Sequence, residues 1–444
     1  MGNRREKILR GLLWTAVLLA GRAAAQIPDV DIPDTAPSRI GVPGVLTPGG
    51  DLVSGATGAA DRTLRRLTGA RFARIDGLAR EHRAELDRDP QGELVVRAEV
   101  IAIDITAAGL QLALDHKFLL KRTQELAELG VKISVLQTPE GWTARRGLKE
   151  LRKLDPTGSY DFNHVYLDGG GATAVTAPAT PALAEGPRGK GRVGLIDGGV
   201  DTSHVTLRGN TVHLFGCGEA RVPSAHGTAV ASLLAGSAGN FRGAAPQAEL
   251  FAADVYCGSP AGGAVDRLAA ALGWMARERV AVINVSLVGP RNALLERVVA
   301  SLVDRGFLIV AAVGNDGPAA APLYPAAYDG VMGVTAVDAR HRVLIEACRG
   351  KHLDLAAPGA DMSAATIGQA GQADTFASVR GTSFAAPIVA GLLARALAQP
   401  DPAARDRAVA ALTGIAEDLG PRGRDDIYGA GLVGAEVAPL ASQR

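Results

Sequence analysis

The second half of the chain alternates short apolar runs with longer amphipathic stretches, and this alternation restricts the fold more than any other feature. Residues 192–196 are nearly continuous in apolar side chains, as expected of a strand buried on both faces of a parallel sheet. Further strands are predicted at 249–255, 280–287, 308–313 and 331–337, with helices between most of them, including 264–278 and 292–304. Such a βαβ series predicts an α/β domain with a mainly parallel sheet over residues 191–444.

Four polar residues stand at the ends of these predicted elements. Asp197 directly follows the strand at 192–196, and Asn315 follows the strand at 308–313. His226 and Ser383 each stand at the start of an apolar stretch that suits a helix. Taken singly, such residues are ordinary in turns and helix caps. Because ligands bind at the carboxyl ends of parallel strands, the four together in one domain indicate a site at that edge of the sheet.

These residue types are the ones that acyl transfer through a serine requires. Serine is a weak nucleophile until a base removes its proton, and histidine titrates near neutrality. A buried carboxylate fixes the histidine tautomer, and an amide N–H donor stabilises the oxyanion. A serine at a helix start also has the positive end of the helix dipole beside its oxygen.

The motifs around these residues resemble those of the subtilisin-like serine peptidases, the subtilases. The aspartate, histidine, oxyanion and serine motifs of that family are matched, in this order, by residues 193–199, 226–231, 311–317 and 381–387. The order Asp, His, Ser is also that of subtilisin. The resemblance implies that Ser383 is the nucleophile and His226 the base. It further implies that Asp197 orients His226, that Asn315 is an oxyanion donor, and that the domain is a subtilisin-like three-layer fold that hydrolyses peptide bonds.

The same resemblance implies where a peptide binds. Residues 283–289 resemble the segment that pairs with the substrate backbone as an added strand. The substrate-binding residues expected from this segment and from the oxyanion segment are Ser286, Leu287, Val288, Gly289, Ala312, Val313 and Gly314. Leu323 stands where the floor of the primary specificity pocket is often glycine, which predicts a shallow pocket and small substrate side chains. Residues 236–245 lack carboxylates where the family often binds calcium, so we expect no metal and no cofactor.

A smaller unit at residues 91–168 precedes this domain. Its predicted elements are a strand at 94–105, a helix at 107–116, strands at 118–126 and 131–136, a helix at 143–154 and a strand at 164–167. The order β-α-β-β-α-β is that of a ferredoxin-like α+β unit. By the resemblance this is a propeptide, a folding chaperone and inhibitor in cis, with Tyr166, Leu167 and the next residues in the cleft. Residues 169–190 are predicted to be an exposed linker, and self-cleavage is expected between about residues 166 and 190.

The amino terminus has the pattern of an export signal. Basic residues precede the apolar run 11–20, and the small residues 23–25 follow it. The run is too short for a membrane anchor, so we expect a signal peptide at 1–25 and export to the periplasm or the medium. Residues 26–90 are predicted to hold a disordered spacer and a charged helix, at 61–87, whose side chains are solvated.

Composition limits the partners of the mature chain. The formal net charge is +1 and charged residues make up 21%, so the chain has no strong positive electrostatic field that would attract nucleic acid or acidic membranes. We expect a monomer without a membrane span that binds a protein or peptide substrate and its own propeptide, but no nucleic acid.

The three cysteines exclude a disulfide scaffold but allow one pair. Cys217 and Cys257 each follow an apolar strand. They form either a disulfide near the edge of the sheet where the active site is predicted, or two buried thiols. Cys348 is then expected to be unpaired and buried.

Two other functions fit part of the sequence. A catalytically silent subtilase fold would serve as a binding module, but all four catalytic residue types are present. An esterase of the α/β-hydrolase class requires a Gly-x-Ser-x-Gly turn, which the Gly-Thr-Ser at 381–383 lacks. The sequence therefore favours an exported serine endopeptidase that is made as a self-processed zymogen.

Overall fold

The computed structural model describes residues 69–436 apart from 170, 174–190, 219 and 369–373. All of them lie in one compact unit, Val53–Arg444. The predicted signal peptide, the spacer up to residue 68 and most of the predicted linker lie outside the described residues. None of the described helices is both long and apolar enough to cross a lipid bilayer.

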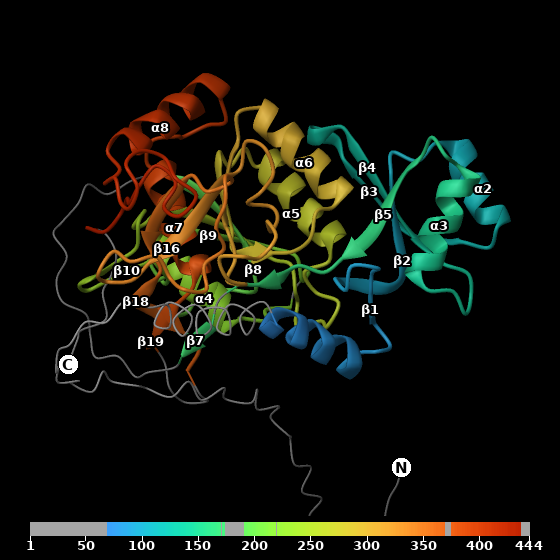
Figure 1. The fold of residues 1–444 in the computed structure, drawn as a ribbon, viewed down its shortest axis with the longest axis horizontal. Coiled ribbons are helices and arrows are strands. Elements are labelled where there is room, and N and C mark those ends of the chain that lie inside the picture. The colour runs from blue at the N-terminus through green and yellow to red at the C-terminus, as the bar shows by residue number, and fades with distance from the viewer. Residues whose placement is uncertain (1–68, 170, 174–190, 219, 369–373, 437–444) are drawn as a thin grey trace, which may run out of the picture. The chain divides into compact units, whose positions relative to one another are not determined.

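A seven-stranded sheet forms the centre of the large domain, residues 191–436 (Figure 1). Its strands, in spatial order, are β17 (Leu355–Pro358), β16 (Met332–Val337), β15 (Leu308–Ala312), β13 (Val282–Val285), β8 (Arg192–Asp197), β12 (Glu249–Asp254) and β9 (Val212–Phe215). Every neighbouring pair is parallel, which confirms the predicted sheet. Strand β17 was not predicted, because a four-residue run that ends in proline resembles a turn.

Helices cover both faces of this sheet and produce three layers, as predicted. On one face pack α4 (Ala225–Ala235) and α7 (Thr382–Ala394), and α8 (Pro402–Gly414) lies against α7. On the other face pack α5 (Val265–Arg277) and α6 (Ala293–Asp304), which lie side by side in Figure 1. Alternate strand residues supply the two cores, such as Leu195 to the first and Ile196 to the second.

The strand order places a crevice beside β8. From β8 the sheet extends through β12 and β9 on one side and through β13, β15, β16 and β17 on the other. In open α/β sheets, ligands bind at the carboxyl ends of strands where the order reverses in this way. Asp197 is the last residue of β8, so its carboxylate lies at that crevice.

One predicted strand, 280–287, is divided in two. Strand β13 ends at Val285, and β14 (Leu287–Val288) leaves the main sheet to pair with β6 (Leu167–Asp168). Ser286 lies between them and exchanges hydrogen bonds with Ser383, which turns the backbone out of the sheet.

The small domain, residues 86–168, has the predicted β-α-β-β-α-β order. Its elements are β2 (Leu94–Ile103), α2 (Ala107–Asp115), β3 (Leu119–Leu126), β4 (Val131–Gln137), α3 (Ala144–Leu154) and β5 (Ser159–His164), with a 3₁₀ turn at Ala127–Leu129. The antiparallel sheet has the order β3-β4-β2-β5, and β1 (Leu86–Arg88) pairs with part of β2. Thr106 and Thr143 cap the two helices. The strand predicted at 164–167 is divided in the structure, because His164 ends β5 whereas Leu167 begins β6, which pairs with β14.

A helix at residues 69–81 precedes β1, and most of its residues are exposed, as predicted, whereas Ile75 is buried. Ile75 is fully buried in a cluster with Leu86, Leu94 and Leu167. Its charged residues Arg71 and Arg74 form ion pairs across the cleft, described below. The docking was not predicted, because charge alone cannot distinguish an exposed helix face from one that docks through ion pairs.

Two further small sheets lie at the rim of the large domain. Strands β18 (Ala360–Thr366) and β19 (Thr375–Arg380) form an antiparallel pair, to which β7 (Gly171–Thr173) adds a third strand. The predicted linker at 169–190 therefore contains a short strand, because the open edge of β19 supplies hydrogen-bond partners that sequence patterning does not reveal. Strands β10 (Ser237–Ala238) and β11 (Phe241–Arg242) form a hairpin in the segment considered for calcium.

Candidate active site

Asp197 and His226 form a buried hydrogen-bonded pair. Nδ1 of His226 lies 2.9 and 3.0 Å from the two carboxylate oxygens of Asp197, and the backbone N–H of Gly198 donates to the same carboxylate. Burial raises the pKa of Asp197 above its usual value, although His226 acts to lower it. Burial lowers the pKa of His226, but the charge and hydrogen bond of Asp197 and the charge of Asp168 raise it, and the net shift of that pKa is upward. The pair therefore holds the Nδ1 proton and directs Nε2 away from Asp197.

Local sequence places His226 at this position. Ser224 caps helix α4 by accepting a hydrogen bond from the backbone N–H of Gly227, so His226 lies in the first turn. Gly227 passes so close to the carbonyl of Gly198 that a β-carbon there would overlap it. The close approach of α4 to the end of β8 brings the imidazole to Asp197.

Ser383 lies in the first turn of α7 and is completely buried. Pro387 has no N–H, so the carbonyl of Ser383 lacks its partner within the helix, and the hydroxyl of Ser286 donates to it at 3.0 Å. The side chain of Asn284 donates in turn to that hydroxyl. The hydroxyl of Ser383 donates to the carbonyl of Ser286 at 3.3 Å, so it is not bonded to His226 in this structure.

Asn315 is held beside the start of α7 with its amide nitrogen unpaired. Its Oδ1 accepts a hydrogen bond from the backbone N–H of Thr382 at 3.1 Å, and Gly314 N–H donates to the hydroxyl of Thr382. Among the described residues, neither Nδ2 of Asn315 nor Nε2 of His226 has a hydrogen-bond partner, although both atoms are buried. The site thus holds a buried, unpaired donor and a buried, unpaired acceptor, and the ring of His226 lies 5.3 Å, between centroids, from that of Phe384, the residue after Ser383.

The chain's own residues 166–169 and 171–173 lie at this site. On one side β6 pairs antiparallel with β14, with Leu167 opposite Val288 and Asp168 opposite Leu287. On the other side β7 pairs with β19. Between them, the position of a β-carbon on Gly169 is 3.3 Å from Oγ of Ser383 and 3.5 Å from Nδ2 of Asn315. The segment therefore lies as an added strand past the serine, which is how a peptide substrate is expected to lie.

The other residues expected to bind substrate have different positions. Leu287 and Val288 pair with the bound segment, whereas the backbone of Gly289 pairs with Tyr324 and its open face contacts the ring of Tyr166. Ala312 is fully buried in the core on one face of the sheet and Val313 in the core on the other face, so both side chains pack beneath the site. Gly314 has a φ of +100° and packs against Leu323.

The sequence did not predict the groups that bind the edge of this segment that faces away from β14. The backbone N–H of Tyr166 donates to the carbonyl of Gly263 at 2.8 Å, and the hydroxyl of Tyr256 donates to the carbonyl of Tyr166 at 3.0 Å. The only sequence signal at 256–263 is a turn-rich stretch that follows a strand, and it carries no information about a partner.

The helix at 69–81 also reaches the site, through two arginines. Both terminal nitrogens of Arg71 donate to Glu93, and its Nε lies 3.2 Å from the carboxylate of Asp316, next to Asn315. Arg71 has a side chain only 8% exposed. Arg74 pairs with the carboxylate and the carbonyl of Asp168. The helix thus ties the bound segment and the oxyanion side of the site to the small domain.

The small domain caps the starts of α5 and α6. The carboxylate of Asp161 accepts a hydrogen bond from the backbone N–H of Ala293, the first residue of α6. Arg122 bridges Glu99 of the small domain and Asp266 in the first turn of α5. Carboxylates at helix amino termini are stabilised by the unpaired N–H groups and by the dipole, so these contacts fix how the small domain sits on the large one.

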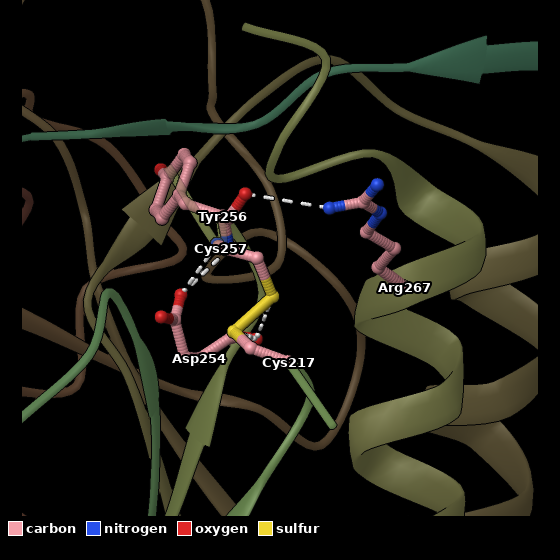
Figure 2. The surroundings of a disulfide bond; sticks show 5 residues. All are labelled: Cys217, Asp254, Tyr256, Cys257 and Arg267. Atoms are coloured by element: carbon pink, nitrogen blue, oxygen red, sulfur yellow. Dashed lines mark hydrogen bonds between the residues drawn. A yellow bond between two sulfur atoms is a disulfide. The ribbon is translucent and has the colours of Figure 1, made fainter. Parts of the chain in front are cut away.

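The structure joins Cys217 to Cys257 in a disulfide, with 5.4 Å between their Cα atoms (Figure 2). The cysteines follow β9 and β12, which are neighbours in the sheet. The carboxylate of Asp254 accepts hydrogen bonds from the backbone N–H groups of Tyr256 and Cys257. The crosslink therefore anchors the turn that presents Tyr256 to the bound segment. Cys348 is a free, buried thiol.

Comparison with known proteins finds one family. Residues 189–431 match the subtilase family. Subtilisin BL of Lederbergia lenta is 35% identical over 274 residues, which cover 60% of this chain and 97% of that protein. Subtilisin E of Bacillus subtilis (strain 168) is 30% identical over 321 residues, which cover 66% of this chain and 78% of that protein.

A solved structure shares the fold. Fervidolysin from Fervidobacterium pennivorans, described as a keratinolytic enzyme related to subtilisin, superposes with a TM-score of 0.64 at 20% identity. The match covers 80% of this chain but only 63% of fervidolysin, so the chain spans less than two thirds of that protein. The resemblance stated from the sequence and the subtilisin-like fold are confirmed.

Proposed function

The chain belongs to the subtilase family of serine peptidases, and we propose that Asp197, His226 and Ser383 carry out its hydrolysis of peptide bonds, with Asn315 as an oxyanion donor. The observation that supports this most is the position of the chain's own Gly169 between Oγ of Ser383 and Nδ2 of Asn315. Labelling of Ser383 by a fluorophosphonate, and its loss in His226→Ala, tests the proposal. A catalytically silent binding module would not be labelled in either protein.

The proposed steps follow from the free atoms of the site. The hydroxyl of Ser383 turns from the carbonyl of Ser286 to Nε2 of His226, which accepts its proton as Oγ adds to the substrate carbonyl. Nδ2 of Asn315 and the amino terminus of α7 stabilise the negative oxygen that forms. His226 then gives the proton to the leaving amine, and Asp197 stabilises the imidazolium in between.

Replacing Asn315 by alanine is expected to lower kcat by roughly 10²–10³ with little change in KM, because its free N–H acts only on the oxyanion. That size is the one known for an oxyanion-hole asparagine of subtilisin, a relative of this chain. Steady-state kinetics on a small peptide measures it. An equal rise in KM without a fall in kcat would assign Asn315 to ground-state binding instead.

We infer that the small domain and the helix at 69–81 are an inhibitory propeptide in cis, and that the chain is a self-processed zymogen. The support is that β6, which ends the small domain, fills the strand position of a substrate, while Asp161 holds the domain on α6 and Arg122 holds it on α5. We further propose that residues 1–25 direct export and that the mature peptidase acts on proteins or peptides as a monomer, in the periplasm or the medium. Sequencing the amino terminus of the exported protein tests both the signal and the processing.

Replacing Arg71 by alanine is expected to weaken retention of the cut propeptide by roughly a hundredfold to a thousandfold. The change removes the guanidinium that pairs with the buried carboxylate of Glu93 and that also faces the carboxylate of Asp316. Breaking a buried ion pair from one side costs about 3–5 kcal/mol. The measurement is the rate at which peptidase activity appears in purified processed chain. Arg80→Ala is the matched control, because Arg80 lies on the same helix and donates to that helix's own carbonyl of Asp76. Equal rates in both variants would contradict a clamping role.

A further inference from the structure

The geometry points to a peptidase that cuts on the carboxyl side of glycine when an aromatic residue lies three positions earlier, with Gly169 and Tyr166 of its own chain as the first such pair. This specificity rests on the proposed peptidase activity and names the substrate class of the same site. In the usual notation, Gly169 is the P1 residue and Tyr166 the P4 residue.

The register of the bound segment identifies Gly169 as the residue whose carbonyl is attacked. Asp168 and Leu167 are held in an antiparallel pair with Leu287 and Val288, so the next residue, Gly169, is the one that reaches Ser383. Strand β7 continues beyond the serine at Gly171–Thr173, which leaves Gly169 at the carboxyl end of the paired part.

Three atoms enclose the space where a side chain on Gly169 would begin. A β-carbon there is 3.3 Å from Oγ of Ser383, 3.5 Å from Nδ2 of Asn315 and 3.7 Å from Cγ2 of Val288. A methyl group here would be tight against Oγ of Ser383 and in ordinary contact with the other two atoms, and a larger side chain needs a pocket beyond it.

Leu323 lies beside this part of the site, packed on Gly314. Gly314, immediately before Asn315, has its open face filled by Leu323, whose Cδ1 lies 2.6 Å from the position of a β-carbon. The thiol of Cys348 is 3.3 Å from the same position, and Leu323 is 5% exposed. Protein interiors at this packing density do not admit an added side chain without displacing one of these groups. We therefore assign Leu323 as the residue that restricts P1 to glycine.

Tyr166 occupies a closed aromatic pocket. It is fully buried, its hydroxyl donates to the carbonyl of Pro290 at 2.6 Å, and its ring lies on Gly289, where a β-carbon would come within 2.6 Å of the ring. Burying such a ring supplies apolar contact, and the carbonyl satisfies its polar end. Loss of the ring leaves a cavity and an unpaired carbonyl, so this pocket selects for tyrosine.

Asp168, at P2, is not part of the specificity. Its carboxylate pairs with Arg74, which lies on the same side of the cut and leaves with the propeptide. A substrate in trans has no such arginine, so we expect no preference for aspartate at P2.

The step at Gly169 balances as an ordinary hydrolysis. Oγ of Ser383 bonds to the carbonyl carbon of Gly169, and Nε2 of His226 takes the hydroxyl proton. The carbon–nitrogen bond to the next residue breaks, and His226 gives that proton to the released amine. Water, deprotonated by His226, then hydrolyses the ester and leaves Gly169 as a carboxylate, with the proton returned to Ser383.

The test is self-processing of the purified full-length chain, read by mass and by the new amino terminus. We expect wild type to be cut after Gly169, Gly169→Ala to be slower, and Gly169→Phe to be slower by on the order of a hundredfold. Gly209→Phe is the matched control, because a β-carbon on Gly209 meets nothing within 4 Å. Tyr166→Ala should slow the cut more than Tyr166→Phe. Leu323→Ala should restore cutting to Gly169→Phe, and the glycine variants stand as a test even where Leu323→Ala does not fold.

The outcomes separate the specificity from the activity. A cut at another bond, or equal rates for wild type and Gly169→Phe, overturns the specificity and leaves the peptidase proposal standing. A wild-type chain that stays uncut although fluorophosphonate labels its Ser383 also overturns the specificity and leaves the peptidase proposal standing. An uncut and unlabelled wild type overturns both.

Discussion

Replacing Ser383 by alanine is expected to lower turnover of a small peptide by roughly a millionfold and to leave the full-length chain uncut. The oxygen that would form the acyl-enzyme is gone, while its neighbours Ser286 and Asn315 are kept. The size of the fall is the one known for the nucleophile of subtilisin. Mass spectrometry of the purified chain and steady-state kinetics measure the two effects.

The double variant Ser383→Ala/His226→Ala sharpens this test. Residues that act as one unit are not additive, so the double variant should be no slower than either single variant. Two independent losses that multiply would show that His226 does not act through Ser383. A cut at Gly169 in Ser383→Ala would assign the processing to another peptidase.

Replacing Asp197 by asparagine is expected to lower kcat by roughly ten-thousandfold and to move the acid limb of the pH profile to lower pH. Only the neutral imidazole of His226 can accept a proton, so activity rises as pH increases through the pKa of His226. Burial lowers that pKa, whereas the charge and the hydrogen bond of Asp197 raise it. Asparagine removes the raising charge and keeps the burial, so the limb shifts downward.

The measurement is kcat/KM as a function of pH after removal of the propeptide, because Asp168 also raises the pKa of His226 in the uncut chain. Asp329→Asn serves as the control for loss of one negative charge, since Asp329 is exposed. A limb that stays in place in Asp197→Asn would show that another group controls the acid side.

The sequence was sufficient where chemistry and local pattern coincide. Asp197 ends an apolar strand, and His226 and Ser383 begin helices, so each could be placed on the sheet edge without coordinates. The proline at 387 was visible as an irregularity, but its consequence was not. Only the structure shows that the carbonyl it leaves free is the one that Ser286 supports.

The sequence was insufficient where the partner lies far along the chain. Arg71 and Arg74 belong to a helix that looks solvated, and nothing near them reveals Asp316 or Asp168 as partners. Strand β7 is made of glycine, alanine and threonine and has no apolar period, so its pairing depends on the open edge of β19 alone. The sequence predicts that Leu323 makes the primary specificity pocket shallow. It does not predict which substrate residue that pocket accepts, because this depends on the position of Gly169 beside Ser383.

The proposed self-processing leaves strand β7 paired with β19, so we expect activation to have a second stage. A cut after Gly169 frees the fragment that ends in β6, yet β7 stays covalently attached to the peptidase and hydrogen-bonded to β19, on the side where the departing half of a substrate must bind. The newly formed amino terminus is therefore itself a competitor for half of the cleft. We expect full turnover only after the new amino terminus has dissociated from β19. The appearance of activity should therefore lag behind the cut even if the propeptide dissociates at once.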